Sequence, residues 1–359
     1  ARWLWRDSLV TVSPIVLVPL LVYLGALLVF GVLGRRVSRS LSGYFVAGKK
    51  LPSWVIAFSS NATGESGWLL LGLTGMGYAV GAQAYWVIVG EMIGIAASWG
   101  FISRKLKRLS DETDSITLPD VLAANFDDRW HLIRGVAVAI IAVMVTTYVS
   151  AQMVATGKAF SGFIGLDYRA GVIIGAVIII GYTFVGGYKA VSYTDVVQGV
   201  LMLAGLIVVQ IVAINAAGGW GGMTATLRDY DPAFIDMFSV LVGSTAGFVA
   251  AVSFAAIGLR FLGVPQMLIR YMSARDDTEL KKARIVSITV LFIFLFGAVT
   301  AGIAGRALFP GLEDSEQVFP TLASELFPPL LTGVLLVIVL SAIMSTVDSL
   351  LLLASSSIV

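Results

Sequence analysis

Apolar residues occur in this sequence as long blocks with few charges inside them. Residues 10–33 contain no charged residue, and further apolar blocks cover residues 54–103, 135–157, 170–188, 196–215, 237–271, 285–305 and 327–359. Roughly 20 apolar residues in a helix are enough to cross the hydrocarbon core of a bilayer. The pattern therefore predicts an all-α, polytopic helical membrane protein.

The blocks also predict how the helices are divided and joined. Block 54–103 is too long for one span and is expected to divide near residues 77–83, which makes nine spans in all. Block 237–271 is expected to be interrupted at residues 258–265. Leu118-Pro119-Asp120 is a start signal for a short surface helix. Residues 186–189 predict a tight connection and residues 218–236 a loop, because glycine favours turns.

The positions of Lys and Arg predict the orientation. If the first span runs from outside to inside and the later spans alternate, 17 of the 24 basic residues lie in inside loops, Arg270 among them. Short cytoplasmic loops are enriched in Lys and Arg. We therefore expect a multi-pass protein of the cell (inner) membrane with its amino terminus outside.

Composition excludes several other classes of protein. The chain is 58% hydrophobic and 13% charged, with a net charge of +2 and no cysteine. Nothing in this balance suggests nucleic-acid binding, and without cysteine there is no disulfide framework or thiol metal site. The single histidine, His131, lies near two arginines in a polar segment and cannot form a histidine metal site alone.

Residues 61–67 combine Asn, Thr, Gly, Glu and Ser inside an apolar block. A carboxylate such as Glu65 is expensive in lipid and marks a functional site by default. Glycines and small polar residues are typical of a broken transmembrane helix, whose freed carbonyl groups can coordinate a cation. The alternative is that these small residues only allow two helices to approach closely.

Five sequence blocks occur in order across nearly the whole chain. They are ATGESGWLLLGL at residues 62–73, TLPD at 117–120, YTFVGGYKAVSYTD at 182–195, GVPQ at 263–266 and SAIMSTVDS at 341–349. Jointly they resemble the sodium/solute symporter family, and sodium/proline symporters most closely.

The resemblance implies the leucine-transporter-type fold, in which two inverted five-helix repeats surround a site at the membrane midplane. A single transporter domain would then have a leading helix at residues 10–33, core helices 1–5 at about 53–215 and core helices 6–8 at about 237–359. The last two core helices would lie beyond residue 359, so we expect this sequence to be a fragment of a longer chain.

The resemblance also implies that sodium is the coupling ion. It places the backbone carbonyls of Ala62, Glu65 and Ala342 and the side chains of Ser345 and Thr346 around one ion. Ala342, Ser345 and Thr346 are spaced i, i+3 and i+4, so they share one helix face. The alternative is that the two hydroxyls bond back to carbonyls of their own helix.

Some relatives hold a second sodium ion at positions that match Asp195, Ser345, Asp348 and Ser349. Two buried carboxylates repel each other unless a cation or a proton lies between them. The alternative is that Asp195 lies near the cytoplasmic end of its helix, where it is hydrated or bonded to Thr194.

The substrate pocket implied by the resemblance lies beside the breaks in core helices 1 and 6. Its expected residues are Ser66, Gly67, Trp68, Tyr148, Arg260, Phe261 and Pro265. Proline symporters differ at four nearby positions: they carry Asp at Gly64, an apolar residue at Glu65, Trp at Ile257 and a small residue at Arg260. We expect Arg260 either to pair with Glu65 or to bind a solute carboxylate.

Together these features predict a sodium-coupled secondary symporter of a small organic solute, a proline-like amino acid or a carboxylate, that works by alternating access in the lipid bilayer. Such a protein makes and breaks no covalent bond, so it is not an enzyme. Two alternatives are a transporter-like sensor domain of a signalling protein and a non-transporting subunit of a membrane complex.

Overall fold

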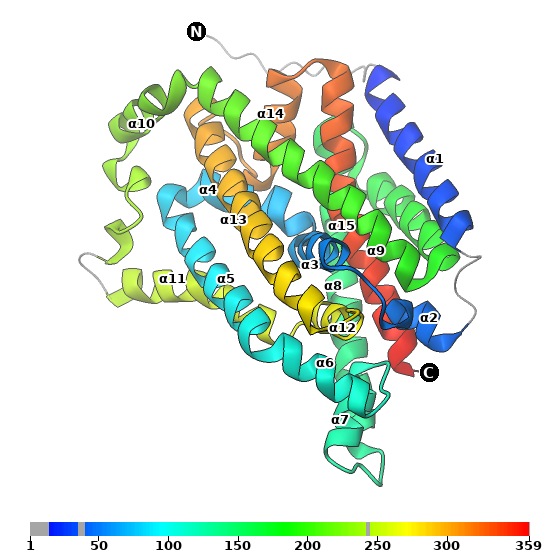
Figure 1. Ribbon diagram of the computed structural model, residues 1–359. Helices are drawn as coiled ribbons and strands as arrows, with labels where there is room; N and C mark the ends of the chain where they lie inside the picture. The colour runs from blue at the N-terminus through cyan, green and yellow to red at the C-terminus, as the bar shows by residue number, and fades with distance from the viewer. Residues whose placement is uncertain (1–13, 35–39, 242–244, 359) are drawn as a thin grey trace.

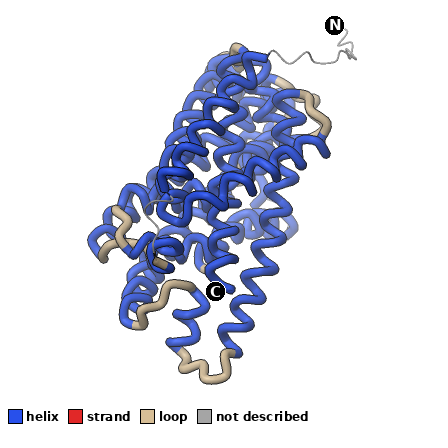
Figure 2. The backbone as a smooth tube through the Cα atoms, turned by 90° about the vertical axis from the view of Figure 1, so that its right-hand side faces the viewer, coloured by secondary structure: helices blue, strands red, loops and turns tan. Residues whose placement is uncertain are grey.

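We describe the fold from a computed structural model, which describes residues 14–34, 40–241 and 245–358. Figure 1 shows a bundle of helices, and Figure 2 shows that the described residues form helices and loops without a strand. One isolated β-bridge joins Leu51 to Ala274. The start of the predicted leading helix, residues 10–13, lies outside the described residues.

The helices of the first part of the chain follow the predicted order. They are α1 (Leu17–Gly34), α2 (Leu41–Val46), α3 (Ser53–Gly67), α4 (Thr74–Val80), α5 (Tyr85–Ala97), α6 (Ser103–Glu112), α7 (Leu118–Asn125), α8 (Leu132–Ile164) and α9 (Tyr168–Ala216). π-Helical turns, η3 (Trp68–Leu73) and η5 (Ser98–Ile102), continue α3 and α5, and the 3₁₀ turn η4 (Gly81–Ala84) precedes α5. The division predicted near residues 77–83 is therefore present.

The second part contains more short helices than the sequence pattern predicted. Its helices are α10 (Gly219–Tyr230), α11 (Thr245–Ala256), the 3₁₀ turn η8 (Ile257–Leu262), α12 (Pro265–Met272), α13 (Asp277–Leu308), α14 (Val318–Leu326) and α15 (Pro329–Ile358). Short 3₁₀ turns, η6 (Pro232–Ile235), η7 (Ser239–Leu241) and η9 (Ser315–Gln317), lie between them. The interruption predicted at residues 258–265 corresponds to η8 and the turn that follows it.

Six helical segments within the described residues are long and apolar enough to cross a membrane: Ser53–Glu112, Leu132–Ile164, Gly187–Ala216, Thr245–Met272, Asp277–Leu308 and Pro329–Ile358. The first of these, at 60 residues, contains both spans expected in block 54–103. Two shorter apolar helices, Pro14–Val29 and Tyr168–Gly181, fall on two further expected spans. The prediction of a polytopic helical membrane protein is confirmed.

Two details of the predicted organisation were wrong, the loop at residues 218–236 and the position of Arg270, whereas the connection at residues 186–189 was confirmed. The segment 218–236 is not simply a loop, because it contains α10 and η6. The tight connection predicted at residues 186–189 is present, because Gly187 leaves the helical conformation, with a φ of 67° and a ψ of 172°, and divides α9 into two helical stretches. Arg270 is not in an inside loop: it lies in α12 and is fully buried.

Helix termini follow local sequence rules. Thr117 and Asp120 form a capping box at the start of α7, the short helix whose start Leu118-Pro119-Asp120 predicts, with both hydrogen bonds at 3.2 Å. Asp276 caps α13 by accepting hydrogen bonds from the backbone amides of Glu279 and Thr278. These bonds to the charged carboxylate hold the pKa of Asp276 below its usual value.

Helix α15 lies in the centre of the bundle. It contacts α3, α8 and α9, and Figure 1 shows it (red) running through the molecule from top to bottom. Its sequence contains a single charged residue, Asp348, and is otherwise apolar or weakly polar on every face. A helix that is hydrophobic all round is buried rather than amphipathic. Its central position places Ser345 and Thr346 against α3.

Helix α5 and turn η8 cross at glycines. A Cβ atom at Gly94 would overlap the Gly258 carbonyl oxygen, and one at Gly90 would overlap the Ala255 carbonyl oxygen. Small residues allow two helix backbones to approach this closely in a membrane. The crossing brings Glu91 of α5 within reach of Arg260 of η8.

We expect Gly94→Ala to lower the stability of the folded protein, because a methyl group at the crossing separates α5 from η8. Overpacking a tight contact costs about 1–3 kcal/mol. Gly100→Ala is the matched control, since no atom lies within 4 Å of a Cβ added there. Thermal unfolding of the two purified variants measures the difference; equal melting temperatures would show that the crossing tolerates separation.

Candidate functional site

Helix α3 is broken where the sequence predicts it. Ser66 has a φ of 55° and a ψ of −170°, in a fully buried stretch of the helix. The Trp68 amide donates to the Ser66 hydroxyl at 3.2 Å, and the π-helical turn η3 begins at Trp68. A positive φ is uncommon for a residue with a side chain and often marks a functional site. The break frees the preceding carbonyls of α3 for contacts outside their own helix.

Oxygen atoms of α3 and α15 meet at this break. The Ser345 hydroxyl lies 3.0 Å from both the Ala62 and Ala342 carbonyl oxygens. The Thr346 hydroxyl lies 3.1 Å from the Thr63 carbonyl and 3.2 Å from the Ala342 carbonyl. All five residues are fully buried. We call this group the α3–α15 oxygen cluster.

The cluster contains four of the five residues predicted to bind sodium: Ala62, Ala342, Ser345 and Thr346. The fifth, Glu65, directs its carbonyl to the Trp68 amide instead. Sequence reasoning missed the Thr63 carbonyl, since a backbone group leaves no signal in residue identity. Both hydroxyls bond back to the Ala342 carbonyl, as the alternative proposed, and each also reaches across to α3. Carbonyl and hydroxyl oxygens are suitable ligands for a hard cation.

A second buried cluster surrounds Arg270. Its Nη2 atom donates to Asp195 Oδ2 at 2.8 Å and to Ser349 Oγ at 2.7 Å. The same atom lies 2.6 Å from Thr63 Oγ1, and Arg270 Nε donates to Ser59 Oγ at 2.7 Å. The side chains of Arg270 and Asp195 have no exposed surface. The positively charged guanidinium of Arg270 therefore lies next to Asp195 and Ser349.

This arrangement bears on the residues expected around a second sodium ion. Asp195 is fully buried, so the alternative of a hydrated helix end was wrong. Ser345 contributes its carbonyl, which accepts from the Thr63 hydroxyl at 3.2 Å and links the two clusters. Asp348 is fully buried on α15, one turn beyond Ser345. The count of basic residues took Arg270 as a loop residue because it lies next to the end of the apolar block 237–271.

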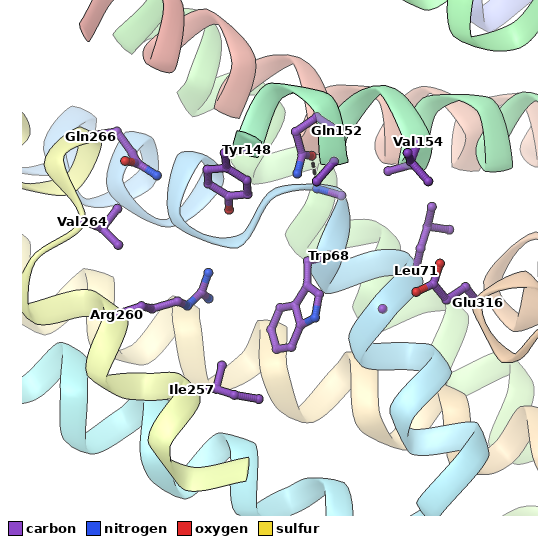
Figure 3. Close-up of a pocket in the computed structure, with 14 residues that line it drawn as sticks. Trp68, Leu71, Tyr148, Gln152, Val154, Ile257, Arg260, Val264, Gln266 and Glu316 are labelled. Carbon is purple, nitrogen blue, oxygen red and sulfur yellow. Dashed lines mark hydrogen bonds between the residues drawn. The ribbon is translucent and has the colours of Figure 1, made fainter. Parts of the chain in front are cut away.

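A cavity of about 530 Å³ opens beside the break in α3. It is lined by Gly67, Trp68, Leu71, Gly72, Tyr148, Ala151, Gln152, Val154, Ala155, Ile257, Arg260, Val264, Gln266 and Glu316. Figure 3 shows Trp68, Tyr148 and Arg260 pointing into one space from η3, α8 and η8.

Four of the predicted substrate residues line this cavity: Gly67, Trp68, Tyr148 and Arg260. Three others, Ser66, Phe261 and Pro265, are neighbours of lining residues and do not line it themselves. Sequence reasoning missed the polar side chains of Gln152, Gln266 and Glu316. Gln152 could have been found from the sequence, because it is a polar residue within an apolar span. In the structure its Oε1 accepts a hydrogen bond from the Gly67 amide at 3.1 Å.

Arg260 pairs with Glu65, as one alternative predicted, at 3.0 Å. The same Nη2 atom also pairs with Glu91 at 2.9 Å, and Nη1 donates to the Gly64 carbonyl at 2.9 Å. The guanidinium lies over the Phe261 ring at 4.7 Å and the Trp68 ring at 5.3 Å. Arg260 is 24% exposed and lines the cavity, whereas both carboxylates are fully buried behind it. The sequence analysis predicted no partner for Glu91, which the structure pairs with Arg260.

The sequence and the fold are also similar to those of known proteins. The sequence matches the family described as "Sodium:solute symporter family" over residues 44–359. It is 36% identical over 338 residues to the "High-affinity proline transporter PutP" of Bacillus subtilis (strain 168), covering 93% of this chain and 70% of that protein. It is 36% identical over 346 residues to a "Sodium/proline symporter" of Staphylococcus aureus (strain USA300), covering 94% of this chain and 66% of that protein.

A solved structure also matches. It is that of a Na+-coupled sialic acid symporter in a substrate-bound outward-open state, with a TM-score of 0.81 and 20% sequence identity, covering 96% of this chain and 73% of the other. At this identity the match shows a shared fold. The chain spans about two thirds of the length of the two curated relatives it matches.

Proposed function

We propose, since this chain belongs to the sodium:solute symporter family, that it carries a small organic solute across a membrane together with sodium. The family and the two relatives are transporters rather than enzymes. The α3–α15 oxygen cluster carries the proposal, because it joins a broken helix to a central helix beside a cavity. A site of this kind can couple an ion to a solute, since both contact the same break.

The sodium ion in this proposal is held by the carbonyls of Ala62 and Ala342 and the hydroxyls of Ser345 and Thr346. In the structure these hydroxyls donate to carbonyls, so they would turn their lone pairs to the ion when it binds. The Glu65 and Thr63 carbonyls lie on the same stretch of α3 and could complete the shell. An ion that bridges α3 and α15 would hold α3 in one position and thereby shape the cavity on its other side.

The solute in this proposal is a proline-like amino acid or another small carboxylate. Arg260 offers a guanidinium at the cavity wall, and the Trp68 ring and Ile257 offer apolar surface. The curated relatives are named for proline, and the resemblance implies that this chain differs from proline symporters at Gly64, Glu65, Ile257 and Arg260. These differences make Arg260 the residue that would distinguish its solute from proline.

Three further features complete the proposal. The amino terminus lies outside the cell (inner) membrane, as the distribution of Lys and Arg indicates. A second sodium near Asp195, Ser345, Asp348 and Ser349 would share Asp195 with Arg270. Transport by alternating access would require α3 and α15 to move relative to one another, or to move together against α8 and α13.

Uptake into proteoliposomes tests the proposal. We expect an inward sodium gradient to drive accumulation of labelled L-proline, or of a carboxylate that competes with it, whereas an equal potassium gradient does not. Accumulation reports coupling, because a gradient can concentrate a solute only when the two move together. No sodium-dependent uptake of any amino acid or carboxylate by reconstituted protein would favour a sensor domain or a non-transporting subunit instead.

A further inference from the structure

Gln152 lies where α8 meets the break in α3. Its side chain is only 3% exposed, and it lines the cavity. Its Oε1 atom accepts a hydrogen bond from the amide of Gly67, the residue that follows the non-helical Ser66. A buried backbone N–H needs an acceptor, and at a break its own helix does not supply one in the regular way. The side chain of Gln152 therefore supplies the acceptor from another helix.

Packing fixes the position of Gly67 on both sides. A Cβ atom at Gly67 would lie 2.7 Å from a side-chain carbon of Ile343 and 3.2 Å from both Ala155 and the Gln152 Oε1 atom. Ile343 follows Ala342, a member of the α3–α15 oxygen cluster. Gly67 is thus held between Gln152 of α8 and the turn of α15 that carries part of this cluster.

The bond to Gly67 also fixes which way the Gln152 amide group faces. A backbone N–H only donates, so the oxygen of the amide group must face it and the nitrogen must point elsewhere. Figure 3 shows that nitrogen turned toward Tyr148 and the cavity. Its two N–H donors make no hydrogen bond to the part of the chain that the structure describes. Buried polar groups are normally hydrogen-bonded, so these donors are available to a molecule in the cavity.

The cavity has other polar side chains, which are Trp68, Tyr148, Arg260, Gln266 and Glu316. Arg260 already donates to two carboxylates and to a backbone carbonyl. The Trp68 indole packs against Gly72 of its own helix, and Glu316 is paired with Lys158. No described hydrogen bond fixes the direction of the Tyr148 hydroxyl or of the Gln266 amide group. Gln152 differs from these residues because its donors are unused and are held in one direction by the break itself.

We propose that Gln152 binds the carboxylate of the solute through Nε2 while its Oε1 keeps the hydrogen bond to Gly67. The proposal rests on the proposed function, and in it Arg260 adds positive charge from another wall of the cavity. An acceptor on Nε2 polarises the amide group and strengthens its bond to Gly67. The solute would then stabilise the break whose carbonyls bind sodium, and by linkage sodium would raise the affinity for the solute.

Two substitutions separate the two ends of the Gln152 amide group. Gln152→Glu keeps an oxygen for the Gly67 amide but replaces the donors by an acceptor, if it is assayed at about pH 8 so that the carboxylate is mainly ionised. Gln152→Met has a similar length and supplies neither group. We expect both variants to bind labelled L-proline about tenfold more weakly or worse at saturating sodium, because each loses a hydrogen bond to a charge. Only Gln152→Met should lose much of the sodium-induced rise in melting temperature measured without solute.

Gln83→Met is the matched control. Gln83 donates to Ser239 at 3.3 Å and does not line the cavity, so this variant should keep both responses of wild type. Wild-type affinity for L-proline in Gln152→Glu would overturn the carboxylate contact, and this variant decides the point even if Gln152→Met does not fold. A wild-type sodium response in Gln152→Met would overturn the role of Gln152 at Gly67.

Measuring binding rather than uptake separates this proposal from the proposed function. If wild type binds L-proline but a sodium gradient does not drive its accumulation, the transport proposal fails, whereas weaker binding by Gln152→Glu still supports the contact. Wild type that binds neither L-proline nor a simple carboxylate such as lactate would overturn the contact.

Discussion

Replacing both Ser345 and Thr346 by alanine should abolish sodium-driven uptake at sodium concentrations that saturate the wild type. The two hydroxyls donate to the Ala62 and Thr63 carbonyls at 3.0 and 3.1 Å and so join α15 to α3. All four residues are fully buried. Contacts between a polar group and a charge are worth about 1.5–3 kcal/mol each. Losing two should weaken sodium binding on the order of a hundredfold or more.

Helix α15 offers a matched control for this pair. Ser356 and Ser357 are also buried, and their hydroxyls bond only to the Leu353 carbonyl of their own helix, at 2.9 and 2.8 Å, among the contacts described. Ser356→Ala with Ser357→Ala removes as many hydroxyls and should leave sodium dependence unchanged. Sodium titrations of uptake and of thermal stability measure both variants. A Ser345/Thr346 variant with the sodium affinity of wild type would exclude the oxygen cluster as the ion site.

Arg270→Gln is expected to destabilise the folded protein more than Gly94→Ala does. Its guanidinium joins α12 to α3, α9 and α15 through Ser59, Thr63, Asp195 and Ser349, and it is fully buried. Removing one member of a buried ion pair typically costs about 3–5 kcal/mol, because the other charge is left without a partner. We therefore expect a large fall in melting temperature and little folded protein.

The companion variants separate charge from packing. Arg270→Gln combined with Asp195→Asn should recover part of the lost stability, since no uncompensated charge is left. Arg275→Gln is the surface control: Arg275 pairs with Glu279 at 2.8 Å but is 59% exposed, and such pairs contribute about 0–1 kcal/mol. If Arg270→Gln melted at the temperature of Arg275→Gln, the Arg270 cluster would not be a stabilising element of the fold.

The sequence alone determined the class of the protein and most of its spans. Long apolar blocks must be helices in a bilayer, since a helix satisfies its own backbone hydrogen bonds there. The small polar residues around Ser66 predicted a break in a helix, and the glycines in residues 186–189 predicted a tight connection; Ser66 and Gly187 both take a positive φ. The spacing of Ala342, Ser345 and Thr346 was enough to place them on one face of a helix, because that face repeats every three to four residues.

Only the tertiary structure decided which groups meet. A count of basic residues cannot separate a charged residue in a loop from one buried near the end of a span, so Arg270 was assigned to the wrong environment. The sequence analysis also left Glu91 without a partner, because Arg260 reaches α5 through a glycine crossing between segments more than 160 residues apart. Backbone carbonyls such as that of Thr63 have no residue-specific signature. Periodicity and composition indicate whether a single helix can lie in a bilayer and which of its residues share a face. Ion sites and charge pairs depend on contacts between helices that are distant in sequence.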